Sequence, residues 1–276
     1  MIKLLLDLLN FLMGYAPLIM NLVLFTGLIY LLADSIKKHA YIYYIIFSIP
    51  TLMTIIQFFG LYSFRGIPVL GQILGANVHM SGFGFPLLII IMYMGALNIK
   101  KPWVKKFMNI RKELSIISGF PVIAHSLIRV PRSFPNALQY FTNNAEYMEG
   151  NTRVQSELGV GISNFGLVLG IVMVVLFLIL WVTSFDSVRK SMGGRRWKQI
   201  QKWSYALYAM LFIHSISLSL GGFLNRGGFG AENTEMVIRQ CIAMSSVTLI
   251  FGSYLIFRLR KAKQGRLRRT EASHDI

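Results

Sequence analysis

Two histidines lie inside apolar segments that are far apart in the chain. His125 follows the run GFPVIA, and His214 follows the run YAMLFI. An ionisable side chain within an apolar, membrane-length segment is costly, so it marks a candidate functional site. The alternative for either histidine alone is a neutral imidazole that is hydrogen-bonded to a neighbouring helix.

The position of each histidine relative to the nearest basic residue indicates that both rings lie at one depth. His125 lies 13 residues after Lys112, and His214 lies 12 residues after Lys202. At the rise of an α-helix, both rings lie roughly 18–20 Å from the basic end of their segments. Two imidazoles at one level on two helices suit a haem iron with both axial positions filled. Such ligation supports one-electron transfer and leaves no open position for oxygen.

The rest of the sequence narrows the kind of metal site. Cys241 is the single cysteine, which excludes an internal disulfide and cysteine-based iron–sulfur or zinc sites within the chain. No CxxCH motif is present, so a haem would be non-covalent, of the b type. Two histidines without a third ligand fit zinc or copper less well. We therefore predict His125 and His214 as metal ligands of one haem b.

Other residues near the two histidines fit a porphyrin but also have simpler explanations. Arg129 lies one turn after His125 and is placed to bind a haem propionate, or to extend toward the membrane surface. Small residues flank each histidine, and they allow either the close approach of a flat macrocycle or helix packing. These small residues are Ser118, Gly119, Gly221 and Gly222. Pro121 is expected to bend the helix that carries His125.

Composition places the chain among integral membrane proteins. Of its 276 residues, 54% are hydrophobic and 14% are charged, with several apolar runs of membrane-spanning length. We expect an all-α integral membrane protein with about seven transmembrane helices in a bundle. The third segment contains SGFGFP, which indicates a broken or late-starting helix. The expected segments are 10–33, 41–63, 82–99, 114–130, 160–184, 203–220 and 236–257.

The distribution of basic residues predicts an orientation. A net charge of +17 would suggest nucleic acid in a soluble protein, but here the basic residues lie between apolar runs and no groove-reading motif accompanies them. Connections on one side (34–40, 100–113, 186–202 and 258–276) hold 21 of the 28 Lys and Arg residues. This asymmetry predicts a multi-pass protein of the cell membrane, in contact with lipid, with its N-terminus outside and its C-terminus in the cytoplasm. A long outer loop is expected over 131–159.

The remaining histidines are expected to lie outside the site. His39 and His274 occur in basic, polar surroundings and are expected to be solvated, whereas His79 is expected at the membrane interface.

Two stretches resemble a known family. LWVTSFDSVRKSMGGRRWKQIQKWSYALYAMLFIHS has a Thr-Ser pair that closes one helix, a basic loop, a tryptophan and a helix with a late histidine. RKELSIISGFPVIAHSLIR has a basic start, a glycine and a late histidine. Both resemble the ferric reductase-like transmembrane domain family, in particular the haem-binding membrane subunit of the bacterial methionine sulfoxide reductase system. The resemblance covers roughly residues 82–220.

The resemblance implies a six-helix core that binds haem between helices, with His125 and His214 as axial ligands. It divides the chain into three parts. Residues 1–81 hold N-terminal transmembrane helices and an outer connection, 82–220 hold the haem-binding core, and 221–276 hold the last transmembrane helix and a basic cytoplasmic tail. Many relatives carry an inner histidine pair, but Lys112 and Gln201 stand in those places here. We therefore expect one haem, near the outer face.

Electrons are expected to come from outside this chain. No G-x-G-x-x-G motif follows a predicted strand, and the tail ends 19 residues beyond the last segment. The expected electron donor is a separate flavoprotein, a membrane quinol, or a flavin (FMN or FAD) that the basic loop from Arg189 to Lys202 could hold. The expected acceptor is a protein or small oxidant on the outer side. The chain would then be an oxidoreductase subunit without its own NAD(P)H or flavin domain.

A haem-free scaffold or transporter subunit of a larger complex is the alternative from a different functional class. Transporters usually carry carboxylates near the middle of the membrane. The acidic residues near the expected segments lie at the segment ends, which argues against a transporter.

Overall fold

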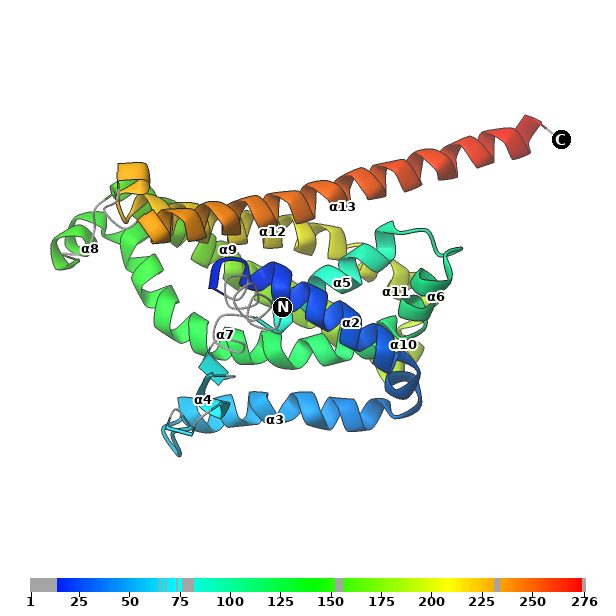
Figure 1. Ribbon diagram of the computed structural model, residues 1–276, viewed down its shortest axis with the longest axis horizontal. Coiled ribbons are helices and arrows are strands. Elements are labelled where there is room, and N and C mark those ends of the chain that lie inside the picture. Colours follow the sequence, from blue (N-terminus) through cyan, green and yellow to red (C-terminus); the bar gives the residue numbers. More distant parts are fainter. Residues whose placement is uncertain are drawn as a thin grey trace, which may run out of the picture.

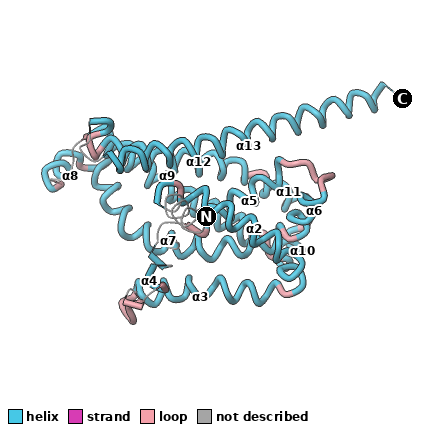
Figure 2. The backbone as a smooth tube through the Cα atoms, in the orientation of Figure 1, coloured by secondary structure: helices cyan, strands magenta, loops and turns pink. Residues whose placement is uncertain are grey.

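The computed structural model describes residues 14–64, 66–67, 69–72, 74–75, 82–151, 156–230 and 234–274. Within them, all regular structure is helical (Figures 1 and 2). Six helical segments are long and apolar enough to cross a membrane, which confirms an all-helical, multi-pass architecture. They are α2 (Pro17–Lys38), α3 (Ala40–Phe58), α7 (Arg111–Thr142), α9 (Glu157–Val182), α11 (Gly194–Gln201) together with α12 (Ser204–Leu224), and α13 (Thr234–His274).

The third predicted segment does not form a helix of spanning length. Residues 82–99 contain α5, which runs over Gly84–Ala96 and has only 13 residues. Ten of these are buried, including Leu87, Ile89 and Met92 at 1% exposure each. A short apolar helix with this burial is a core helix surrounded by longer ones. The helix starts late, at Gly84, as the glycines and proline of SGFGFP indicate.

The predicted outer loop over 131–159 is wrong for most of its length. Helix α7 continues to Thr142, and α8 follows over Asn144–Gly150. Pro121, Pro131 and Pro135 all lie within α7, and Figure 1 shows this helix curving along the bundle. Its outer part is held by packing, because Ala137 has no exposed surface. Proline is tolerated inside a membrane helix when neighbouring helices stabilise the bend.

Two apolar clusters meet on opposite faces of α5. On one face, Leu88 and Met92 pack with Leu211 of α12 and Phe251 of α13. On the other face, Leu87 and Ile91 belong to a cluster with residues of α2, α6 (Pro102–Asn109) and α7. Since lipid is as apolar as these side chains, close packing supplies the stability of the bundle. Outward-facing apolar side chains on α2, α3 and α9 fit contact with lipid, among them Leu31, Leu52 and Val175.

Three ion pairs join one end of the bundle. Lys37 lies 2.9 Å from Glu113, Lys106 lies 3.1 Å from Asp34, and Lys112 lies 2.8 Å from Asp186. They connect the end of α2 with α6, the start of α7 and the start of α10 (Asp186–Met192). We call this the basic end. Figure 2 shows several of its loops gathered together.

A lysine of α13 caps the end of α5 at the basic end. The Lys261 Nζ donates to the carbonyl oxygens of Gly95 and Leu97, at 2.9 and 2.8 Å. Because α5 ends here, no backbone N–H of a following turn donates to these carbonyls. The Lys261 ammonium donates to them instead.

Replacement of this lysine should loosen the bundle. We expect Lys261→Met to lower the free energy of unfolding by about 1–3 kcal/mol, because two charge-assisted hydrogen bonds disappear. The measurement is thermal unfolding in detergent. Lys263→Met, which removes an exposed lysine of the same helix, is the matched control. Equal midpoints for both variants would contradict the capping role.

Candidate functional site

The imidazole of His214 is held against α9 by one hydrogen bond. Its Nδ1 lies 2.7 Å from the carbonyl oxygen of Gly166. A carbonyl oxygen can only accept, so Nδ1 carries the proton and Nε2 of the neutral ring has a free lone pair. Histidines that bind metals usually have this arrangement, because the bond at one nitrogen fixes the ring while the other nitrogen coordinates. This hydrogen bond therefore leaves Nε2 of His214 available as a metal ligand.

Glycines of α9 make room for this ring. A Cβ at Gly170 would lie 3.0 Å from Cε1 of His214, and a Cβ at Gly166 would lie 2.9 Å from the Cβ of Ser217. Further out, a Cβ at Gly159 would lie 2.6 Å from the backbone nitrogen of Asn225. These positions are separated by seven and four residues along one face of α9, and they let α12 approach closely. Gly166 and Gly170 were not predicted as part of the site, although their spacing of four residues puts them on one face of a helix.

His125 lies half-buried on α7, one turn beyond the bend at Pro121. Two neighbouring helices stabilise that bend. The Thr51 hydroxyl of α3 donates to the Phe120 carbonyl at 2.7 Å, and the Trp181 indole of α9 donates to the Ile116 carbonyl at 2.9 Å. The predicted bend therefore has partners on both sides of α7. These contacts fix the stretch of helix that carries His125.

The small residues predicted to flank a porphyrin mostly serve helix packing. A Cβ at Gly119 would overlap the Trp181 indole, and a Cβ at Gly221 would lie 2.5 Å from the carbonyl oxygen of Gly159. The Ser118 hydroxyl donates to the Ser115 carbonyl of its own helix at 2.9 Å. Of the two explanations left open by sequence, the structure therefore favours packing for Gly119 and Gly221.

Helices α7 and α12 start at the same end of α9. Lys112 of α7 binds Asp186, just after α9, while Gln201 donates from Nε2 to the Thr183 hydroxyl at 2.9 Å. The Trp197 indole donates to the Thr183 carbonyl at 2.9 Å. The Thr-Ser pair, the tryptophan and the glutamine of the sequence motif thus form one cap on α9. From this shared start, each helix reaches its histidine 13 residues further on, counted from Lys112 and from Gln201.

The cap also keeps the Asp186 carboxyl ionised. The Lys112 ammonium, which donates to Asp186, holds the pKa of that carboxyl below its usual value. The pair is therefore charged on both sides at neutral pH.

A buried amide in the outer half of α9 lacks a partner. Asn164 is 4% exposed, and its Nδ2 has no hydrogen-bond acceptor among the described residues. Leaving such a donor unpaired costs free energy, so this amide is a candidate partner for an acceptor group. Asn164 precedes Gly166 by two residues, about 3 Å of helix rise, and so lies slightly outward of the His214 ring. An anionic or carbonyl group of a bound ligand would satisfy it.

The donor set fits a haem better than a bare metal ion. Among the described residues, no group of three or more His, Cys, Asp or Glu side chains could hold a metal ion. Two imidazoles suffice for haem iron, because the porphyrin supplies the other four nitrogens. An imidazole with an available Nε2 on α12 and a half-buried histidine on α7 are compatible with such a group. Arg129 is half-buried one turn beyond His125.

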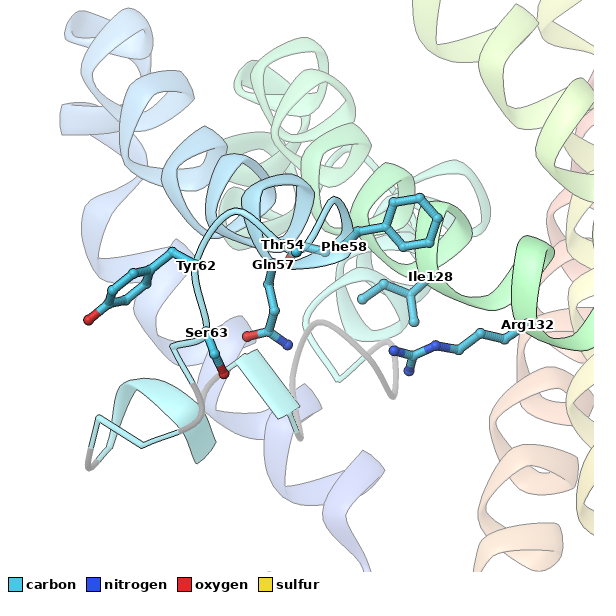
Figure 3. Close-up of a pocket in the computed structure, with 8 residues that line it drawn as sticks. Thr54, Gln57, Phe58, Tyr62, Ser63, Ile128 and Arg132 are labelled. Atoms are coloured by element: carbon cyan, nitrogen blue, oxygen red, sulfur yellow. The ribbon is translucent and has the colours of Figure 1, made fainter.

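A cavity of about 270 Å³ opens between the outer ends of α3 and α7. In Figure 3, the side chains of Arg132 and Gln57 point toward one another across it, with Ile128 beside them, whereas Tyr62 points away. Ile128 and Arg132 follow His125 by one and two turns of α7. The cavity therefore lies farther along α7 from the basic end than His125 does.

The other histidines lie away from this region or outside the described residues. His39 ends α2 in the turn to α3, at the basic end. His79 lies outside the described residues, and the side chain of His274 also does.

Comparison with known families decides the class of the site. Residues 80–212 match a family described as the ferric reductase like transmembrane component. This part of the chain is therefore similar to the ferric reductase-like transmembrane family. The ferric reductase-like region includes His125 and ends two residues before His214. This similarity suggests a role in membrane electron transfer, and members of that family generally bind haem.

One curated relative extends the comparison. It is described as an uncharacterized protein of Treponema pallidum (strain Nichols), and it is 27% identical over 184 residues. The similarity covers 66% of this chain and 44% of the relative, so the chain spans less than half the length of that protein. No solved structure matches the chain.

Proposed function

We propose that this protein is a b-type haem electron-transfer protein that moves electrons through the membrane to an acceptor on the outer side. One observation carries the proposal. His214 donates from Nδ1 to the Gly166 carbonyl, which leaves Nε2 as a ligand inside a ferric reductase-like bundle. The start that α7 and α12 share at α9 supports a common depth for His125 and His214.

The residues of the chain would hold the haem and limit its chemistry. When bound, the haem supplies an iron that gains and loses one electron. His125 and His214 would hold the haem iron through their imidazoles, and iron held by two imidazoles supports one-electron transfer instead of oxygen chemistry. The Gly166 carbonyl fixes the orientation of the His214 ring and raises its basicity as a ligand. Asn164 and Arg129 would bind the propionates.

The topology gives the direction of transfer. We assign the basic end to the cytoplasm, since Lys and Arg are concentrated there. This puts the haem in the outer half of the membrane, with the N-terminus outside and the C-terminus inside. A flavoprotein, a flavin or a quinol gives electrons from the inner side. The cavity at Gln57 and Arg132 receives the acceptor, a protein or a small oxidant, on the outer side.

The experiment that tests this function is a haem count. The full chain, purified from membranes supplied with haem, should contain one b-type haem per chain by pyridine haemochrome assay. Two haems per chain would contradict the replacement of the inner ligands by Lys112 and Gln201. Colourless, monodisperse protein would overturn the proposal in favour of a haem-free scaffold or transporter subunit.

A substitution at Asn164 tests the assignment of the propionates. Asn164→Leu keeps the branched arrangement of heavy atoms but removes the amide donor, so we expect haem affinity to fall by about tenfold, the value of one hydrogen bond to a charged group. The measurement is haem retention during titration with a competing apo-haem protein. Asn144→Leu, at the start of the outer helix α8, is the control. Unchanged retention in Asn164→Leu would show that the amide serves another purpose.

A further inference from the structure

An open groove of about 630 Å³ lies between α7, α9 and α12, at the end of the bundle opposite the basic end. Figure 1 shows the outer ends of these three helices gathered beside α8. The floor of the groove is one stripe of α9, made by Leu158, Gly161, Ile162 and Phe165. Leu158 and Phe165 are 68% and 51% exposed. The volume is within the range of sites for organic ligands.

Three polar side chains, one from each helix, line this groove without a partner. They are Tyr140 of α7, Glu157 of α9 and Ser217 of α12. Their side-chain oxygens make no hydrogen bond or ion pair with any residue that the structure describes. Ser217 is only 7% exposed, and an unpaired hydroxyl with this burial costs free energy. The groove therefore suits a ligand that has polar atoms as well as an apolar part.

The three polar groups lie at three successive levels of the bundle. Glu157 is the first residue of α9, at its outer end. The Tyr140 hydroxyl lies at the level of Gly161, since a Cβ at Gly161 would come within 2.7 Å of it. Ser217 lies at the level of Gly166, since a Cβ at Gly166 would lie 2.9 Å from the Cβ of Ser217. The hydroxyls are therefore roughly 6 and 13 Å inward of Glu157 along α9.

This order of groups matches a phospholipid with a primary ammonium headgroup. A carboxylate at the membrane surface attracts an ammonium and accepts its N–H bonds. A phenol one level inward can donate to a phosphate oxygen, and a hydroxyl further inward can donate to an ester carbonyl. Ammonium, phosphate and ester follow in that order from the headgroup of phosphatidylethanolamine toward its acyl chains. The chains would continue along the same face of α9, where Val172 is exposed.

The groove is distinct from the haem site proposed above. Tyr140 lies 15 residues after His125 on α7, which is about 22 Å of helix, and Ser217 lies one turn outward of His214. Phosphatidylcholine fits the groove less well, because its quaternary ammonium has no N–H group to donate to Glu157. The two lipids have the same net charge, so the basic end attracts them equally and the groove is what distinguishes them.

We propose that this groove binds one molecule of phosphatidylethanolamine from the leaflet opposite the basic end. Its ammonium binds Glu157, its phosphate accepts from Tyr140, and an ester carbonyl accepts from Ser217. The bound lipid joins the outer parts of α7, α9 and α12. This site does not depend on the electron-transfer function, because none of its contacts involves the haem.

Native mass spectrometry of the full chain tests the site. The protein is delipidated in detergent and titrated with phosphatidylethanolamine or with phosphatidylcholine of the same acyl chains. We expect one phosphatidylethanolamine to bind per chain, about fivefold more tightly than phosphatidylcholine, the value of an ion pair at an exposed carboxylate. Equal affinities, or a preference for phosphatidylcholine, would overturn the assignment of the headgroup. Failure of both lipids to bind would overturn the site.

A variant of the carboxylate gives the matched comparison for the headgroup. Glu157→Gln should lower the affinity for phosphatidylethanolamine by about fivefold and leave that for phosphatidylcholine unchanged. Glu149→Gln, which removes an exposed carboxylate of α8 that does not line the groove, should change neither affinity. A preference for phosphatidylethanolamine that survives Glu157→Gln, or that Glu149→Gln abolishes, would overturn the proposal.

A variant of the buried hydroxyl tests the depth of the lipid. Ser217→Ala keeps the Cβ that packs near Gly166 and removes only the hydroxyl. It should lower the affinity for ester-linked phosphatidylethanolamine by about fivefold and leave that for the diether analogue, which has no ester carbonyl, unchanged. Ser219→Ala, on the same helix but outside the groove, should change neither affinity. Equal effects of Ser217→Ala on the two lipids would overturn the assignment of the ester.

Discussion

His214→Gly protein is expected to retain less than about one tenth of the wild-type haem, because one remaining imidazole gives five-coordinate, weakly held iron. His125→Gly should behave in the same way. The loss follows from the bond between the His214 Nδ1 and the Gly166 carbonyl, which leaves Nε2 as the one ring nitrogen available to coordinate the iron of the proposed haem. Haem content and the reduced-minus-oxidised visible spectrum measure the effect.

A rescue experiment separates ligand loss from misfolding. Added imidazole should restore a six-coordinate spectrum in His214→Gly protein, since the missing side chain leaves a space of its own size. His39→Gly, at the basic-end turn between α2 and α3, should retain the full haem content. Loss of haem in His39→Gly to the same degree, or wild-type haem content in either ligand variant, would contradict the assignment.

Gly119→Ala is expected to lower the free energy of unfolding by about 2–4 kcal/mol, which combines the cost of overpacking with the loss of one hydrogen bond. A methyl group at Gly119 would overlap the Trp181 indole. The indole would then move and lose its bond to the Ile116 carbonyl, which now measures 2.9 Å. Because this contact joins α7 to α9 just before the bend at Pro121, haem retention should also fall.

The control for this substitution is another glycine inside a membrane helix. A Cβ at Gly252 of α13 meets nothing within 4 Å. Gly252→Ala should therefore leave stability unchanged or raise it slightly, as expected from helix propensity. Denaturant titration of both variants in the same detergent makes the comparison. Equal stability of the two alanine variants would refute close packing at Gly119.

Sequence predicted the parts of this fold that depend on transfer free energy. The long apolar helices and the basic end follow from hydropathy and from the positions of Lys and Arg. Hydropathy cannot separate a helix that crosses the membrane from a shorter apolar helix enclosed by others, so α5 was predicted too long. Pro131 and Pro135 were interpreted as the start of a loop, but the packing of Ala137 against its neighbours keeps α7 helical.

The candidate site was only partly predictable for a related reason. His125 and His214 were found because an ionisable residue in an apolar segment is conspicuous. The Gly166 carbonyl that orients His214 belongs to the backbone, so no residue type reveals it. Asn164 looked unremarkable in the sequence, because its lack of a partner appears only once α9 is packed. For Gly119 the sequence left two explanations open, the close approach of a porphyrin and helix packing, and the Trp181 indole beside it supports packing.

Electron paramagnetic resonance of the ferric protein tests the central claim most directly, since it reports the axial ligands of the iron. The wild-type protein should give a low-spin signal typical of two imidazole ligands, and both His125→Gly and His214→Gly should convert any haem that remains to a high-spin signal. A high-spin wild-type protein, or a low-spin signal that survives both substitutions, would show that these two histidines do not bind one iron.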